Sequence, residues 1–181
     1  MSALPPIVMI HGMWCVGEIW SSFRLPFEAA GYTVHTPTLR HHALGAPHPE
    51  LGTTSLRDYV DDLAAFIATL PERPILIGHS MGGLLTQLLV AKGLAKAAIL
   101  VCSAAPRGVF PVRLSMLPAT TRIFSAPGFW KKPNKLNARE ARYAVFNEIS
   151  EGEAEARIDD LVHESGRAAA EIVFALFQKN G

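Results

Sequence analysis

Ser80 is the residue whose surroundings most clearly indicate chemistry. The segment from Gly78 to Gly83 reads Gly-His-Ser-Met-Gly-Gly; it follows the apolar run Pro74 to Ile77 and precedes a helical run at 84–91. A serine on a sharp strand-to-helix turn exposes its hydroxyl at the top of a sheet, and flanking glycines let the backbones approach closely. The pattern predicts a nucleophile elbow with Ser80 as the nucleophile, and a glycine-rich turn with an incidental serine is the alternative.

A second segment lies where acyl-transfer chemistry needs donors. The apolar run Pro6 to Ile10 leads directly into His11-Gly12-Met13-Trp14. The tetrahedral intermediate of acyl transfer carries a negatively charged oxygen, which preorganised backbone N–H groups stabilise. An apolar strand that ends in His-Gly therefore predicts a contribution to an oxyanion hole.

Together the two segments resemble the α/β-hydrolase family, and the resemblance covers the whole chain. It implies that Ser80 is the nucleophile and that the N–H groups of Met81 and Met13 are the oxyanion donors. Trp14 is the alternative to Met13 as donor, or a wall of the acyl pocket. The oxyanion and substrate-binding positions implied in this way are His11, Gly12, Met13, Trp14 and Met81.

The resemblance also implies an activity. It is the hydrolysis of carboxylic esters, thioesters or lactones through an acyl-enzyme, with a small-molecule acyl substrate and no cofactor. Two other functions stay open, because a fold and an elbow do not fix a reaction. They are a non-catalytic binding or interaction protein on the same scaffold, and a cofactor-free, haloperoxidase-like perhydrolysis.

The acid and base of a catalytic triad are not evident. In the family they follow the serine along the chain, on loops after later strands. Here one more strand, 97–102, follows the elbow helix, and the loop from Ser103 to Arg107 has no carboxylate. We therefore expect the N-terminal portion of such a hydrolase, with both groups missing from residues 1–181.

Histidines already present are poor substitutes for the base. His79 adjoins Ser80 but points away from it in an elbow, and His11 fits a structural role between neighbouring loops. Asp159 and His163 are four residues apart on an expected helix, a spacing typical of a solvated surface pair.

Three further histidines, His41, His42 and His48, cluster in the loop at 37–54. A metal site there would need a carboxylate or cysteine at ligand spacing. None was identified, so these are predicted to be loop histidines, and no metal site is expected.

Composition indicates a globular protein. The 181 residues are 49% hydrophobic, and a net charge of +1 argues against a nucleic-acid-binding surface. Cys15 and Cys102 fit packing thiols in a reducing compartment. With no secretory leader pattern and no apolar run long enough to span a membrane, we expect a soluble, cytoplasmic protein.

Strand-like and helix-like segments alternate, which predicts an α/β fold: a mostly parallel sheet with helices on both faces. Residues 1–106 are expected to form the hydrolase core and 107–181 a helical cap insertion. The strand at 97–102 would be an uncovered sheet edge, which predicts an oligomer or a complementing chain. Expected strands are 6–10, 32–36, 74–77 and 97–102, and expected helices in the core are 19–30, 55–70 and 84–91.

The cap is expected to be helical throughout. Capping boxes predict two helix starts, at Asn137 with Glu140 and at Ser150 with Glu153, and a third helix is expected over about 167–178. Cap aromatics line the acyl pocket in the family, although ordinary packing is the alternative for each. The candidates are Phe110, Phe124, Phe129 and Trp130.

Overall fold

The computed structural model describes residues 4–109 and 117–174. The chain forms two compact units, and each takes two stretches of sequence. Unit 1 combines Met1–Arg40 with Leu56–Pro106, and unit 2 combines His41–Ser55 with Arg107–Gly181. The segment 41–55, assigned from the sequence to the core portion, thus clusters with the residues after 106.

Unit 1 contains a four-stranded parallel sheet in the order β2-β1-β3-β4. The interior strand β1 is buried along its whole length, as expected of a parallel strand covered on both faces. The strands are β1 (Ile7–Ile10), β2 (Val34–His35), β3 (Ile75–His79) and β4 (Ala97–Val101).

Strand β2 is shorter than expected. The sequence predicts a strand from Tyr32, but the Tyr32 N–H donates to the Phe27 carbonyl of the preceding helix at 3.0 Å. That bond belongs to the helix C-terminus, where Gly31 adopts φ 90°. Extended pairing with β1 therefore begins only at Val34.

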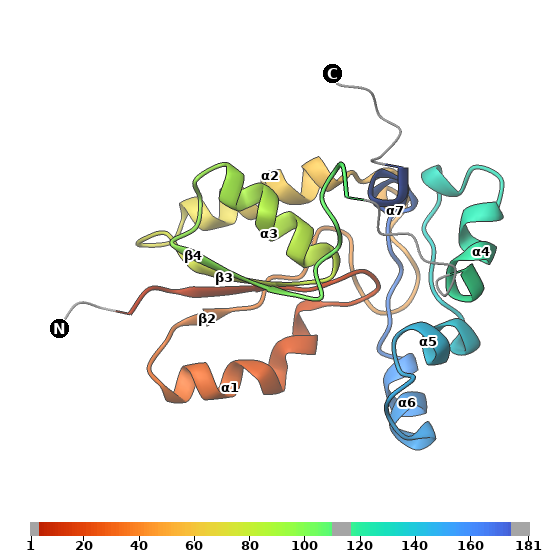
Figure 1. The fold of residues 1–181 in the computed structure, drawn as a ribbon, viewed down its shortest axis with the longest axis horizontal. Helices are drawn as coiled ribbons and strands as arrows, with labels where there is room; N and C mark the ends of the chain where they lie inside the picture. Colours follow the sequence, from red (N-terminus) through yellow and green to blue (C-terminus); the bar gives the residue numbers. More distant parts are fainter. Residues whose placement is uncertain (1–3, 110–116, 175–181) are drawn as a thin grey trace. The chain divides into compact units, whose positions relative to one another are not determined.

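Helices cover both faces of this sheet, as predicted. Helix α1 (Ser21–Ala29), preceded by a 3₁₀ turn at Gly17–Trp20, lies on one face, while α2 (Leu56–Ala68) and α3 (Met81–Ala91) lie on the other (Figure 1). The inward face of α2 holds Tyr59, Val60, Leu63 and Ile67, all buried. Most of α3 is buried, which fixes its N-terminus against the sheet.

Unit 2 is mainly helical, and both predicted capping boxes are confirmed. The Asn137 side chain accepts from Glu140 N–H at 2.9 Å, and the Glu140 carboxylate accepts from Asn137 N–H at 2.9 Å. Ser150 and Glu153 make the same reciprocal pair. The elements are η2 (Leu51–Thr53), α4 (Leu117–Ser125), η4 (Phe129–Lys131), α5 (Ala138–Ala144), α6 (Glu151–Ile158) and α7 (Gly166–Phe174).

The expected helical pairing of Asp159 with His163 is wrong. Helix α6 ends at Ile158, with Asp159 as its C-cap. The chain then turns so that Asn134 and Glu164 exchange backbone hydrogen bonds of 2.9 and 2.8 Å in an antiparallel bridge. Because Glu164 is extended and α6 has already ended, Asp159 and His163 do not lie on one face of a helix.

Helix α7 begins one residue before the expected position. Ser165 Oγ accepts from Ala168 N–H at 3.2 Å and donates to the Thr54 carbonyl at 2.6 Å. Residues 175–178 of the expected helix lie outside the described residues. Ser165 thus joins α7 to the segment 41–55 within unit 2.

Aromatic rings pack together around η4. Phe129 is buried, with ring centroids 5.2 Å from Phe124 and 6.2 Å from Phe174. Trp130 is 49% exposed, and Phe110 lies outside the described residues. Within the described ranges, no helix has the length and apolar character needed to cross a membrane.

Candidate active site

Ser80 occupies a sharp turn between β3 and α3. Its backbone has φ 53° and ψ −119°, a positive-φ conformation that a non-glycine residue rarely adopts. The next residue, Met81, already begins the helix. Such strain persists only where the surroundings hold it, and it concentrates at functional sites.

Backbone hydrogen bonds hold this turn on both sides. Ser80 N–H donates to the Val101 carbonyl at 3.0 Å, which extends the β3–β4 pairing by one residue. The Ser80 carbonyl accepts from Gly83 N–H and from Ala104 N–H, both at 2.9 Å. The serine is therefore fixed both to its own helix and to the loop that follows β4.

Close backbone contacts explain why glycines surround the serine. A Cβ added to Gly82 would lie 2.2 Å from the Ile10 carbonyl oxygen, and one added to Gly78 would lie 2.3 Å from the Gly82 carbonyl oxygen. Real Cβ atoms do not approach backbone oxygens so closely. Only glycine lets β1, β3 and the start of α3 come together in this way.

The His-Gly segment lies directly beside the elbow. A Cβ on Gly12 would lie 3.0 Å from the Ser80 Cβ, so the backbone at Gly12 is in contact range of the candidate nucleophile. Met13 and Trp14 follow as half-buried residues, and Trp14 adopts φ 60°. The structure thus places the predicted oxyanion segment and Ser80 at the same end of the sheet.

Met81 is positioned to offer a backbone donor. It is fully buried and is the first residue of α3. The first N–H groups of an α-helix have no acceptor within the helix, and the helix dipole makes this end favourable for negative charge. Its N–H group adjoins Ser80 in sequence, as an oxyanion donor requires.

His11 is a structural residue in this geometry. It is fully buried; its Nε2 accepts from Leu39 N–H at 3.0 Å, and its Nδ1 lies 2.8 Å from the Gly12 carbonyl oxygen. These partners assign the proton to Nδ1. With both nitrogens engaged, His11 ties the loop after β2 to the end of β1.

Among the described residues of unit 1, no side chain forms a hydrogen bond with Ser80 Oγ. Burial lowers the pKa of the neighbouring His79, which favours its neutral form. Burial is also the main cause that lowers the pKa of His163, assisted by the Lys135 charge.

The loop after β4 is positioned by Gln87 and Ser103, two residues that were not predicted from the sequence. Gln87 Nε2 donates to Ser103 Oγ at 2.8 Å, and Ser103 Oγ donates to the Ala104 carbonyl at 2.9 Å. A Cβ on Gly83 would lie 2.6 Å from the same Ser103 Oγ. Since Ala104 N–H donates to the Ser80 carbonyl, this network supports the elbow. In the sequence, the only sign of this close contact was the second glycine of the Gly82-Gly83 pair.

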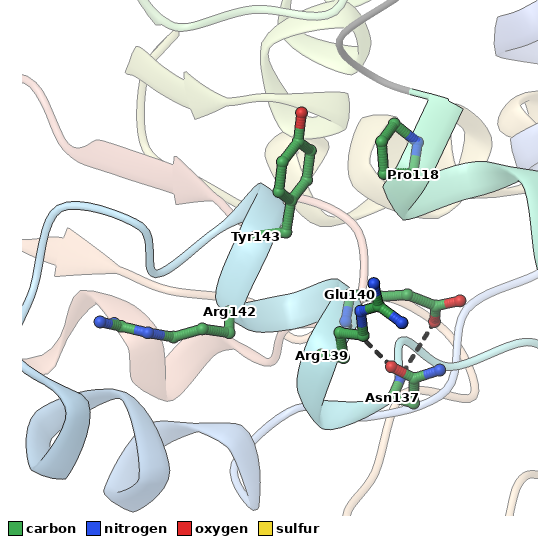
Figure 2. Close-up of a pocket in the computed structure, with 6 residues that line it drawn as sticks. All are labelled: Pro118, Asn137, Arg139, Glu140, Arg142 and Tyr143. Carbon is green, nitrogen blue, oxygen red and sulfur yellow. Dashed lines mark hydrogen bonds between the residues drawn. The ribbon is translucent and has the colours of Figure 1, made fainter.

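A separate pocket of about 700 Å³ lies in unit 2 (Figure 2). Two of its charged groups are engaged within unit 2: Glu140 binds Arg122 at 2.7 and 2.6 Å, and Arg142 donates to the Ile149 carbonyl at 2.7 Å. These contacts stabilise the helices that line the pocket. It is lined by Pro118, Asn137, Arg139, Glu140, Arg142 and Tyr143.

Comparison with known proteins agrees with this geometry. The model of the Alpha/beta hydrolase family matches residues 7–176, nearly the whole chain. The chain belongs to the α/β-hydrolase family. The match includes β1, the elbow and the helices of unit 2, so the resemblance seen in the sequence is confirmed.

Two curated relatives match part of this family member. A pyrethroid hydrolase of Sphingobium wenxiniae is 34% identical over 77 residues, 42% of this chain and 27% of the relative. Methylesterase 17 of Arabidopsis thaliana is 33% identical over 86 residues, 44% of this chain and 29% of the relative. The matches thus span less than a third of either relative's length.

Solved structures share the fold. An extracellular α/β-hydrolase from a Paenibacillus species superposes with a TM-score of 0.73 at 22% identity, covering 89% of this chain and 67% of that one. A methylesterase from Arabidopsis gives a TM-score of 0.69 at 15% identity, covering 93% and 70%. At these identities the likeness establishes the fold alone.

Proposed function

We propose that the protein is a serine hydrolase of carboxylic esters with Ser80 as its nucleophile. The strained, positive-φ backbone of Ser80 between β3 and the N-terminus of α3 is the observation that carries the proposal. A strained residue held by both neighbouring elements is expected where a hydroxyl must be presented to a substrate. Family membership supports the same assignment.

The proposed reaction has two halves. Ser80 Oγ gives up its proton to a base and attacks the acyl carbon, and the C–O bond to the alcohol then breaks as the alcohol takes up a proton. Water next cleaves the acyl-serine, which releases the acid and restores the hydroxyl. During each half, the N–H groups of Met81 and Met13 stabilise the oxyanion, with Trp14 as the alternative to Met13.

Esters are favoured over thioesters and lactones by the names of the relatives. One is named a hydrolase of pyrethroids and the other a methylesterase. Those matches span only 27% and 29% of the relatives' lengths, so the relatives' names support the ester as substrate class but not a particular acyl or alcohol group.

The test compares variants of the native protein on p-nitrophenyl acetate, a thioester and a lactone. Ser80→Ala is expected to abolish hydrolysis, while Ser125→Ala, at an exposed serine of α4, is expected to leave the rate unchanged. Hydrolysis by Ser80→Ala close to the parental rate would refute the nucleophile assignment. A parent that binds the esters without cleaving them would instead identify a non-catalytic binding protein.

A further inference from the structure

Three potential metal ligands lie together in the segment 41–55 of unit 2. Ligand atoms of His41, His48 and Glu50 all fall within 4.8 Å of one another. His41 Nε2 is 3.6 Å from Glu50 Oε2, and the rings of His41 and His48 stack with centroids 3.9 Å apart. We propose that these three side chains form a binding site for Zn²⁺, independent of the proposed hydrolase activity.

The spacing of the ligand atoms is close to that of a zinc site. Zinc–nitrogen and zinc–oxygen bonds of about 2.0–2.2 Å place tetrahedral ligand atoms about 3.3 Å apart. The 3.6 Å between His41 Nε2 and Glu50 Oε2 nearly meets this requirement. Two imidazoles and one carboxylate form a ligand set that zinc accepts, with the fourth position left to water.

One imidazole of the cluster already presents a ring nitrogen as an acceptor. His48 Nδ1 accepts from Glu50 N–H at 3.2 Å, which places its lone pair on Nδ1. This bond is long for an N–H···N contact, and an ion can displace it.

The backbone that carries the ligands is held in place. Leu51 N–H donates to the His48 carbonyl at 3.1 Å, and Glu50 is the N-cap of η2. On the other side of His41, the buried His42 contacts the buried Glu164 at 3.0 Å between Nε2 and Oε2. The three ligands thus project from a loop anchored at both ends.

Coordination requires one rearrangement. The two rings are inclined by only 10°, so their lone pairs lie in nearly parallel planes and cannot both point at one ion. His48 is exposed and lies outside the helices and strands, which lets its ring turn about the side-chain bonds. Glu50, with a side chain 75% exposed, can follow the ion without disturbing the interior.

The experiment titrates Zn²⁺ into the full chain by calorimetry in a buffer that does not bind metals. The parent is expected to bind one ion. His48→Asn, which keeps an acceptor for Glu50 N–H, and Glu50→Gln should each weaken binding by about tenfold or more. Glu155→Gln, at an exposed carboxylate of α6, is the matched control and should bind as the parent does.

A second measurement follows the ligand atoms themselves. Imidazole nitrogen resonances of His41 and His48 should shift on addition of Zn²⁺, while those of His35, in β2, should not. His41→Gly removes a ligand from a position with φ 65°, which glycine adopts readily, and should lose binding while the fold persists. Absence of Zn²⁺ binding by the parent, or unchanged affinity in the His48 and Glu50 variants, would overturn the site.

Discussion

Gly82→Ala tests whether close approach of backbones builds the elbow. The added Cβ would lie 2.2 Å from the Ile10 carbonyl oxygen and 2.5 Å from the His11 carbonyl oxygen. Both oxygens belong to the backbone at the end of the interior strand, so α3 must move away from β1. Overpacking of this kind costs about 1–3 kcal/mol, and a backbone contact places it near the upper end. Alanine recovers about 1 kcal/mol of helix propensity, which leaves a net loss of about 2 kcal/mol.

Gly152→Ala supplies the matched control. Gly152 lies in α6, and an added Cβ there meets nothing within 4 Å. This variant should gain up to about 1 kcal/mol from helix propensity alone. Urea unfolding, followed by circular dichroism, measures both changes in the free energy of unfolding. A Gly82→Ala protein as stable as the parent would refute the close-contact explanation of the elbow.

Three further predictions concern the oxyanion donor, an ion pair and the sheet edge. Met81→Pro removes the proposed donor and should lower the hydrolysis rate about 10²–10³-fold, whereas Met81→Leu should stay within about tenfold; a folded, fully active proline variant would place the donor elsewhere. The hydrogen bond from Arg122 lowers the pKa of Glu140. The pair therefore adds to the free energy of unfolding at pH values above the usual carboxyl pKa, and this contribution is lost as the pH falls through the lowered pKa. In an acid titration of stability, Glu140→Gln should not show that loss. Among the described residues β4 pairs only with β3, so the amides of β4 that point away from β3 should exchange quickly unless a partner chain covers them. Full protection of those amides in a dilute monomer would contradict this.

The elbow could be predicted from the sequence because its determinants are local. An apolar strand, a serine between glycines and a following helix fix the turn within about ten residues, and the structure has β3, Ser80 and α3 in these positions. Both capping boxes were predictable for the same reason, since each needs only two residues three apart.

Contacts between distant segments could not be predicted in this way. His42 meets Glu164, and Ser165 meets Thr54, across more than a hundred residues, so periodicity gave no indication that 41–55 clusters with unit 2. The proposed zinc site depends on a contact of the same kind, between Glu50 and His41. The Glu50 carboxylate reaches His41 only because the loop doubles back.

Covalent labelling of the native protein tests directly whether Ser80 is the nucleophile. A fluorophosphonate reacts with an activated serine, and mass spectrometry of the digested protein locates the adduct. We expect an adduct on Ser80 that is lost in Ser80→Ala and retained in Ser125→Ala. An adduct on a different serine, together with ester hydrolysis that survives Ser80→Ala, would contradict it.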